Sequence, residues 1–159
     1  MVGPLKDLLS HQAWADATFF FAWGAAGVTE DEDLRRRTDH LVLTQEYLLK
    51  VLKGDVVVAP PEHPVPGFLD LKRRCESIHQ VFRALGRGLD DASLSRTVRV
   101  PWFPDSPCVI SVSDVLLQVC LHTQHHRGQC MARLKALGAS AKDVDYIIWL
   151  WKQKPEPRW

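Results

Sequence analysis

The sequence has almost no net charge, no long apolar run and no closely spaced pair of cysteines. Lys plus Arg (20) nearly balance Asp plus Glu (19), so the chain lacks the positive potential that attracts nucleic acid or anionic membranes. The longest apolar run near the start, FFFAWGAAGV, is too short to cross a bilayer, and the start lacks the order of a signal peptide. We therefore predict a cytoplasmic protein with neither a nucleic-acid partner nor a membrane segment.

The four cysteines, Cys75, Cys108, Cys120 and Cys130, include no C-x-x-C pair. A zinc ribbon and a thioredoxin-like dithiol both use cysteines at that spacing, so the sequence favours neither. Free cysteine is among the most frequently buried residue types, and thiols stay reduced in the cytosol. We therefore expect buried, reduced thiols.

The composition is that of an ordinary globular protein. Hydrophobic residues make up 46% of the chain and charged residues 25%, which argues against disorder. A chain of 159 residues buries roughly two thirds of the surface that it exposes when unfolded. No internal repeat, low-complexity tract or linker divides the sequence, and we predict a single domain over residues 1–159.

Apolar residues at steps of three and four predict four long helices. These helices cover about residues 5–23, 33–53, 68–85 and 114–137. Thr29 and Glu32 have the spacing of a capping box before the second helix, and Ser113 is the expected N-cap of the fourth. The pattern predicts an all-α four-helix bundle.

Shorter elements are expected to connect and close this bundle. The proline-rich segment VVVAPPEHPVPG, residues 56–67, predicts an extended crossover between the second and third helices. Alternating polar and apolar residues predict a small β-hairpin of strands 97–100 and 108–110, with its turn in residues 102–107, before the last long helix. A short C-terminal helix over residues 142–151 is expected to cover an open end of the bundle.

Three of the histidines stand close together in the segment LHTQHHRGQC, residues 121–130. His122 and His126 fill two places in an otherwise apolar stripe of the fourth predicted helix, so both are expected to point inward. Each residue advances about 100° around a helix, which places His125 at the edge of the buried face. The i, i+4 spacing of His122 and His126 allows both imidazoles to reach one metal ion.

His40 is the candidate for a third ligand. It lies on the second predicted helix with Leu43, Tyr47 and Val51 at i+3, i+7 and i+11 and is therefore expected to face inward. Three neutral imidazoles with open positions suit zinc, nickel, copper or iron. The alternative is that the three histidines are hydrogen-bonded core residues that bind no metal.

Three segments of the chain resemble parts of a known family, the DinB-like (DNA-damage-inducible) metal-binding four-helix bundles, which are relatives of the bacillithiol- and mycothiol-dependent transferases. The segment HTQHHRGQC is similar to the family's H-x-x-x-H-R-G-Q signature. DHLVLTQEYLLKVLKGD resembles the second-helix segment with its single ligand histidine, and SHQAWADATF resembles the first-helix stretch Tyr-Asn-x-Trp-Ala-Asn. The resemblance covers nearly the entire chain.

The resemblance implies a fold, a metal site and an oligomeric state. It implies an up-down-down-up bundle in which His40, His122 and His126 hold a divalent metal ion, often nickel or zinc. Homodimers are common among proteins of this kind, so the resemblance also implies a homodimer.

The chain departs from the family pattern in the first helix. His11 stands at the usual Tyr, Gln12 at the first Asn and Asp16 at the second Asn. Substrate contacts that this stretch makes in the family are therefore not carried over to this chain.

The residues around the two spaced histidines have further expected roles. Gln129 lies near the ligand face and is a candidate to orient an imidazole. Arg127 is expected to pair with a surface acid, with an anionic substrate group as the alternative. Gly128 costs about 1 kcal/mol relative to Ala in a helix, which helix packing or site access is expected to offset. Cys130, four residues after His126, is expected to pack in the core rather than bind the metal.

The predicted function is metal binding, with three alternatives for the role of the metal. The resemblance favours a metal-dependent S-transferase that joins a low-molecular-weight thiol to an electrophilic small molecule. Metal-dependent hydrolysis is less favoured, because Thr123 stands where H-E-x-x-H enzymes carry the glutamate. A non-catalytic metal-binding protein of stress response or interaction is the third alternative. Asp16, His11 and His125 are candidates for a general base if they project into the same cavity as the metal.

Overall fold

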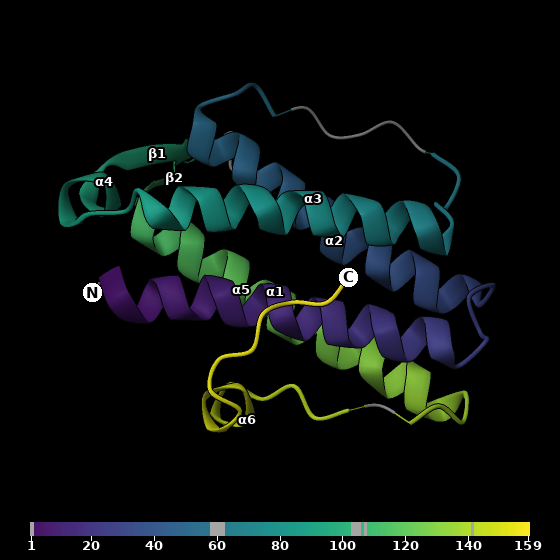
Figure 1. Ribbon diagram of the computed structural model, residues 1–159. Coiled ribbons are helices and arrows are strands. Elements are labelled where there is room, and N and C mark those ends of the chain that lie inside the picture. The colour runs from purple at the N-terminus through teal and green to yellow at the C-terminus, as the bar shows by residue number, and fades with distance from the viewer. Residues whose placement is uncertain (1, 58–62, 103–105, 107, 141) are drawn as a thin grey trace.

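Four long helices form the body of the protein in the computed structural model, which describes residues 2–57, 63–102, 106, 108–140 and 142–159 (Figure 1). These helices are α1 (Val2–Ala25), α2 (Glu32–Lys53), α3 (Phe68–Arg87) and α5 (Val112–Ala136). In Figure 1, α1 and α5 run in one direction and α2 and α3 in the other. The predicted all-α, up-down-down-up four-helix bundle is confirmed.

The main core lies between these four helices. α2 packs against α5, and α1 packs against both α3 and α5. α1 contributes an aromatic layer of Phe19, Phe20 and Trp23, and none of these side chains is more than 1% exposed. Aromatic side chains bury roughly 150–250 Å² each, so this layer is a large part of the hydrophobic stabilisation. Leucine and valine side chains of the other helices close around it.

The first turn of α2 differs from the prediction. Asp31 is the N-cap, and the Leu34 N–H donates to its Oδ1 at 2.8 Å, so the predicted cap at Thr29 is wrong. Arg133 of α5 donates to the other oxygen of Asp31 at 2.6 Å. A contact from a distant helix therefore favours this cap. The predicted end of α2 is confirmed at Gly54, which adopts a left-handed conformation with φ of 77°.

The predicted hairpin is confirmed, and it determines where α5 begins. β1 (Thr97–Val100) pairs antiparallel with β2 (Cys108–Ser111). β2 continues directly into α5, so Ser111 is the N-cap, and it forms a capping box with Asp114. The predicted cap at Ser113 is wrong, because that residue already lies inside the first turn of the helix.

Two short helices, α4 and α6, complete the fold of the described residues. α4 (Asp91–Ser95) was not predicted, because a helix of one turn with a single buried apolar side chain, Leu94, has no periodic pattern. α6 (Tyr146–Trp151) is shorter than the predicted 142–151. It begins after Asp145, which occupies the N-cap position.

Two predicted connections are described only in part. Residues 58–62 of the proline-rich segment and residues 103–105 and 107 of the hairpin turn lie outside the described residues. In the part of the chain that is described, no helix combines the length and the hydropathy of a membrane-spanning segment.

The C-terminal part of the chain returns across α1 (Figure 1). In α6, Trp149 is 2% exposed and packs in a small second core with Trp14, whereas Trp151 is 74% exposed. At the end of the chain, the ring of Trp159 stacks on His79 with 5.7 Å between centroids. α1 is therefore covered by α6 and the C-terminal tail as well as by the other long helices, which also buries polar side chains of α1.

Candidate metal centre

The three histidines predicted as ligands meet between α2 and α5. Their candidate ligand nitrogens all lie within 4.8 Å of one another. The ring centroids of His122 and His126, which lie on successive turns of α5, are 4.2 Å apart. The His40 ring, from α2, lies 4.5 Å from that of His126 and 5.4 Å from that of His122. We call these three residues the histidine cluster.

The histidine cluster lies at the edge of the bundle rather than in its core. His40 is exposed, whereas His122 and His126 are half-buried. The prediction that His40 faces inward is wrong, and it is the preceding residue, Asp39, that is buried, at 8% exposed. The guanidinium of Arg74 donates to Asp39 at 3.0 Å, which offsets the cost of burying the carboxylate.

The fully buried stripe of α5 passes directly beside its two clustered histidines. Thr123 is 0% and Arg127 is 1% exposed, and each follows one of the histidines in the sequence. Neighbouring residues are about 100° apart around the helix, so His122 and His126 lie at the margin of the buried face. The prediction that they fill places in the buried stripe is wrong, because Thr123 and Arg127 fill those places. His125, predicted to lie at the edge of the buried face, is exposed instead.

The electrostatic environment keeps the imidazoles of His122 and His126 neutral. Burial, followed by the nearby His126 and His40, lowers the pKa of His122 to about 4. Burial also lowers the pKa of His126, although a hydrogen bond with Gln129 opposes the effect. Neutral imidazole is the form that coordinates metal ions. Both α5 histidines are therefore ready to bind a metal at pH 7.

One nitrogen of the histidine cluster is buried without a hydrogen-bond partner in the described part of the chain. His122 Nδ1 is buried and has no hydrogen-bond partner among the described residues. Leaving a buried polar atom unpaired costs free energy, and such atoms are rare in folded proteins. A metal ion held by the three imidazoles fits this donor set.

Gln129 orients the imidazole of His126, as the sequence predicts. Its Oε1 can only accept, so the Nδ1–H of His126 donates to it at 3.0 Å. This hydrogen bond leaves the lone pair on Nε2 of His126, the nitrogen available to an ion. The Nε2 of Gln129 donates in turn to Nε2 of His125 at 3.0 Å. His125 is thus linked to the histidine cluster without belonging to its set of candidate ligands.

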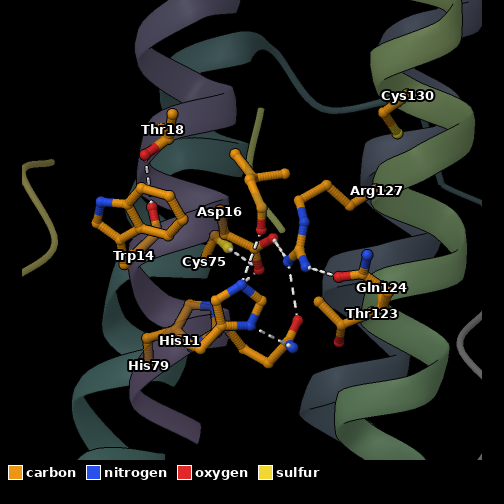
Figure 2. A network of polar contacts seen from close by, with 12 residues as sticks. His11, Trp14, Asp16, Thr18, Cys75, His79, Thr123, Gln124, Arg127 and Cys130 are labelled. Atoms are coloured by element: carbon orange, nitrogen blue, oxygen red, sulfur yellow. Dashed lines mark hydrogen bonds and ion pairs between the residues drawn. The ribbon is translucent and has the colours of Figure 1, made fainter. Parts of the chain in front are cut away.

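A second group of potential metal ligands lies in the core (Figure 2). Asp16 of α1 and Cys75 and His79 of α3 are all buried, and their ligand atoms also lie within 4.8 Å of one another. His79 Nε2 lies 2.7 Å and Cys75 Sγ 3.7 Å from Oδ2 of Asp16. Our sequence analysis missed Cys75 and His79, although their i, i+4 spacing on the amphipathic α3 is a pattern that could have indicated them.

Arg127 belongs to this buried group, which we call the Asp16 network. Its Nη1 donates to Oδ1 of Asp16 at 2.7 Å and to Oε1 of Gln12 at 2.9 Å (Figure 2). The prediction that Arg127 pairs with a surface acid is therefore wrong. Burial by itself raises the pKa of Asp16, but the charge of Arg127 and the hydrogen bond with His79 outweigh burial and lower this pKa to about 2. The acid is ionised at pH 7.

Two of the three candidate general bases are enclosed in the core. His11 and Asp16 are 2% and 1% exposed. His11 Nε2 donates to the Val144 carbonyl at 2.8 Å, and its Nδ1 accepts from Gln12 at 3.2 Å. Neither side chain is placed to exchange a proton with a substrate at the exposed histidine cluster. His125 is the candidate that the solvent reaches.

The cysteines are free, and three of the four are buried. Cys130 is 0% exposed, with its Sγ 3.7 Å from the Thr38 hydroxyl. Burial raises the pKa of the Cys130 thiol to about 11, whereas a metal ligand must be a thiolate. These observations confirm core packing for Cys130.

Gly128 does not mark a close approach between helices. A Cβ atom built on this residue meets no described atom within 4 Å. The expectation that helix packing offsets the cost of this glycine is therefore wrong, and Gly128 faces open space on α5.

Comparison with known proteins identifies the family of this chain. The family model described as the DinB superfamily matches residues 33–130, which is more than half of the chain and includes all three clustered histidines. The chain therefore belongs to the DinB superfamily. The matched residues begin after α1, so they do not include the first-helix stretch that departs from the family pattern. No curated protein and no solved structure matches the chain.

Proposed function

We propose that this member of the DinB superfamily binds one divalent metal ion through His40, His122 and His126, with nickel and zinc as the first candidates. The observation that supports this proposal most is the meeting of three imidazoles from two helices within 4.8 Å. The unpaired His122 Nδ1 adds support from the described residues. Imidazole is a suitable ligand for both metals.

The exposure of the histidine cluster supports a reactive rather than a purely structural site. Structural zinc sites fill all four positions with protein ligands, whereas catalytic sites leave a position open. Three ligands at an exposed edge leave room for a small molecule. When bound, a divalent ion supplies Lewis-acid chemistry that lowers the pKa of a thiol or a water molecule.

We further propose that the protein transfers a low-molecular-weight thiol to an electrophilic small molecule. In such a reaction the thiol loses its proton, the sulfur forms a bond to the electrophilic carbon, and a leaving group departs with its electron pair. His125 is the exposed side chain proposed to accept the proton, which its Nε2 takes when the 3.0 Å hydrogen bond from Gln129 opens. The clustered histidines would hold the metal ion that lowers the pKa of the thiol.

Two alternatives have less support. A hydrolase would use a carboxylate near the metal, but Thr123 is 0% exposed and its hydroxyl accepts a hydrogen bond from Gln45 at 3.0 Å. A non-catalytic metal-binding protein would use the ion mainly to hold α2 against α5. The second alternative is separated from the transferase by an activity assay.

Metal content tests the first proposal. We expect one equivalent of metal in protein purified without nickel resin or reconstituted with Zn²⁺ or Ni²⁺. His122→Ala and His126→Ala should each lose the metal, whereas His125→Ala should retain it as the matched control. Equal loss from His125→Ala would show that the ligand set is wrong, and a wild-type protein that takes up no metal would refute the proposal.

Thiol consumption tests the second proposal. Metal-loaded protein is incubated with glutathione, bacillithiol or mycothiol and a panel of electrophiles, and loss of free thiol is followed. We expect turnover with at least one pair and none in His126→Ala. One bound metal without turnover across the panel would support the non-catalytic alternative.

The homodimer implied by the family resemblance is part of this proposal. Ile147 and Trp151, 68% and 74% exposed, lie one turn apart on α6 and offer an apolar contact surface. Light scattering on the full chain should give twice the chain mass of 18.1 kDa. A monomer at micromolar concentration would refute this part.

A further inference from the structure

Each clustered histidine of α5 directly precedes a residue that is anchored in the core. Thr123 follows His122, and Arg127 follows His126. Because successive side chains are about 100° apart, the rotation of α5 that sends Thr123 and Arg127 into the core also sends the two histidines to the edge. Whatever fixes that rotation therefore fixes the direction of both imidazoles.

The Asp16 carboxylate is linked to α5 at both of these positions, directly at Arg127 and through Gln45 of α2 at Thr123. Its Oδ1 accepts directly from Arg127 at 2.7 Å (Figure 2). Its Oδ2 accepts from Gln45 at 3.2 Å, and the same Gln45 amide nitrogen donates to the Thr123 hydroxyl at 3.0 Å. His79 of α3 donates to Oδ2 as well, at 2.7 Å. One carboxylate on α1 thus holds two successive turns of α5.

Gln45 extends this anchoring to the third histidine. Gln45 and His40 both lie on α2, and Gln45 is 1% exposed. Its contact with Thr123 therefore fixes the position of α2 along the axis of α5. This contact lies close to the place where His40 meets His122. Metal–ligand distances are acceptable within about 0.2 Å, so a small slip between the two helices is enough to weaken a metal site that they share.

The Asp16 network is better explained as an anchor than as a second metal site. An ion bound there would compete for a carboxylate that already pairs with Arg127 at 2.7 Å, and it would place two cationic groups together in the core. Burial raises the pKa of the Cys75 thiol well above its ordinary value, so Cys75 stays protonated. The hydrogen bonds to Asp16 already satisfy both of its oxygens.

We propose that Asp16 is a positioning residue for the metal centre. Through Arg127 and Gln45 it fixes the rotation of α5 about its own axis and the position of α5 along α2. The three imidazoles then converge before the ion arrives, which avoids an ordering cost at the moment of binding. This inference rests on the proposed metal binding by the histidine cluster. Asp16 itself does not touch the ion.

Four variants separate positioning from stability. Asp16→Asn keeps the volume but places an N–H₂ group among the hydrogen-bond donors, so it displaces the Gln45 contact. Thr123→Val removes only the hydroxyl acceptor, and Thr123→Ser restores it. Phe82→Leu alters an apolar core side chain of α3, 1% exposed, and controls for a general loss of stability.

The measurement is zinc affinity of the full-length, metal-free proteins, determined against a competing chelator at a temperature where circular dichroism shows each variant to be folded. We expect Asp16→Asn to weaken zinc binding by about 10- to 100-fold, the usual range for residues that support ligands from behind. Thr123→Val should weaken it less, and Thr123→Ser and Phe82→Leu should bind as the wild type does. The absorption spectrum of bound Co²⁺ should change in Asp16→Asn, because the ligand geometry changes.

The outcomes distinguish the inference from the proposed function. If the wild type binds zinc and both Asp16→Asn and Thr123→Val bind it as tightly as Phe82→Leu does, the positioning role is refuted and metal binding stands. A fall from two bound ions to one in Asp16→Asn would make Asp16 a ligand and would also refute it. If the wild type binds no metal, the proposed function fails and the positioning role fails with it. Should Asp16→Asn not fold, Thr123→Val against Thr123→Ser decides.

Discussion

Two clusters of potential metal ligands lie among the described residues, one at the edge of the bundle and one in its core, and in each the ligand atoms lie within 4.8 Å of one another. In the histidine cluster, the buried His122 Nδ1 lacks a partner among the described residues. In the Asp16 network, the carboxylate pairs with Arg127 and His79, each at 2.7 Å. The first cluster therefore keeps an unpaired polar atom among its potential ligands, whereas the second already contains a cation, the guanidinium of Arg127.

The two environments also favour opposite charge states, although each of them lowers a pKa. At the edge, burial and neighbouring imidazoles lower the pKa of His122 to about 4 and favour its neutral form. In the core, Arg127 overcomes the effect of burial and lowers the pKa of Asp16 to about 2, which favours the charged form. Proximity of ligand atoms thus identifies candidates, but free lone pairs and the local charge distinguish a metal site from an ion-pair network.

The largest expected effect comes from removing Arg127, the cation of the Asp16 network. Arg127→Met leaves Asp16 buried without its charged partner, so we expect the free energy of unfolding to fall by about 3–5 kcal/mol. Urea unfolding of the metal-free protein measures this change. Arg133→Met is the control, because Arg133 pairs with Asp31 while 36% exposed, and such pairs contribute about 1 kcal/mol or less. Similar losses of unfolding free energy in both variants would show that the buried ion pair of the core contributes no more than the partly exposed pair of Arg133.

The next effect is the pH dependence of stability that Asp16 produces. Its pKa is about 2 in the folded protein and 3.8 ordinarily, so its contribution is complete above about pH 4 and is lost as the pH falls through 2. The contribution is on the order of 2 kcal/mol. Urea midpoints between pH 7 and pH 2 should decline more steeply in the wild type than in Asp16→Asn. Parallel curves would show that the Asp16 pKa is not lowered by folding.

The smallest effect is expected at Gly128, which lies beside Arg127 but belongs to neither cluster. Gly128→Ala should stabilise the protein by up to about 1 kcal/mol, because the added Cβ meets no described atom within 4 Å. Zinc affinity should not change. Thermal unfolding and zinc titration measure both quantities, and a lower melting temperature would indicate a contact or motion that requires the glycine.

The histidine cluster could be found from the sequence because its pattern is local. Two of its members are four residues apart on one helix, and that spacing is enough to predict that they converge. The third, His40, was found as well, but its burial was predicted wrongly. Its place at the edge depends on how α2 is rotated, and Asp39 enters the interior, where Arg74 of α3 and His63 pair with it.

The Asp16 network could not be predicted in the same way. Arg127 and Asp16 are 111 positions apart in the chain, and nothing near Arg127 in the sequence indicates that its acid is buried. α1 is covered by α6 and the C-terminal tail in addition to the long helices, which is why polar residues of α1 lie in the core.

By itself the sequence determined the long helices, the hairpin and the three histidines that meet, because helical and strand periods and i, i+4 spacing are properties of short segments. Only the tertiary structure decided which neighbour of each histidine enters the core, which residue caps α2, and which acid Arg127 pairs with. The physical reason is that the rotation of a helix about its own axis is set by simultaneous packing and ion pairing with all of its neighbours, and those partners lie far away in the chain.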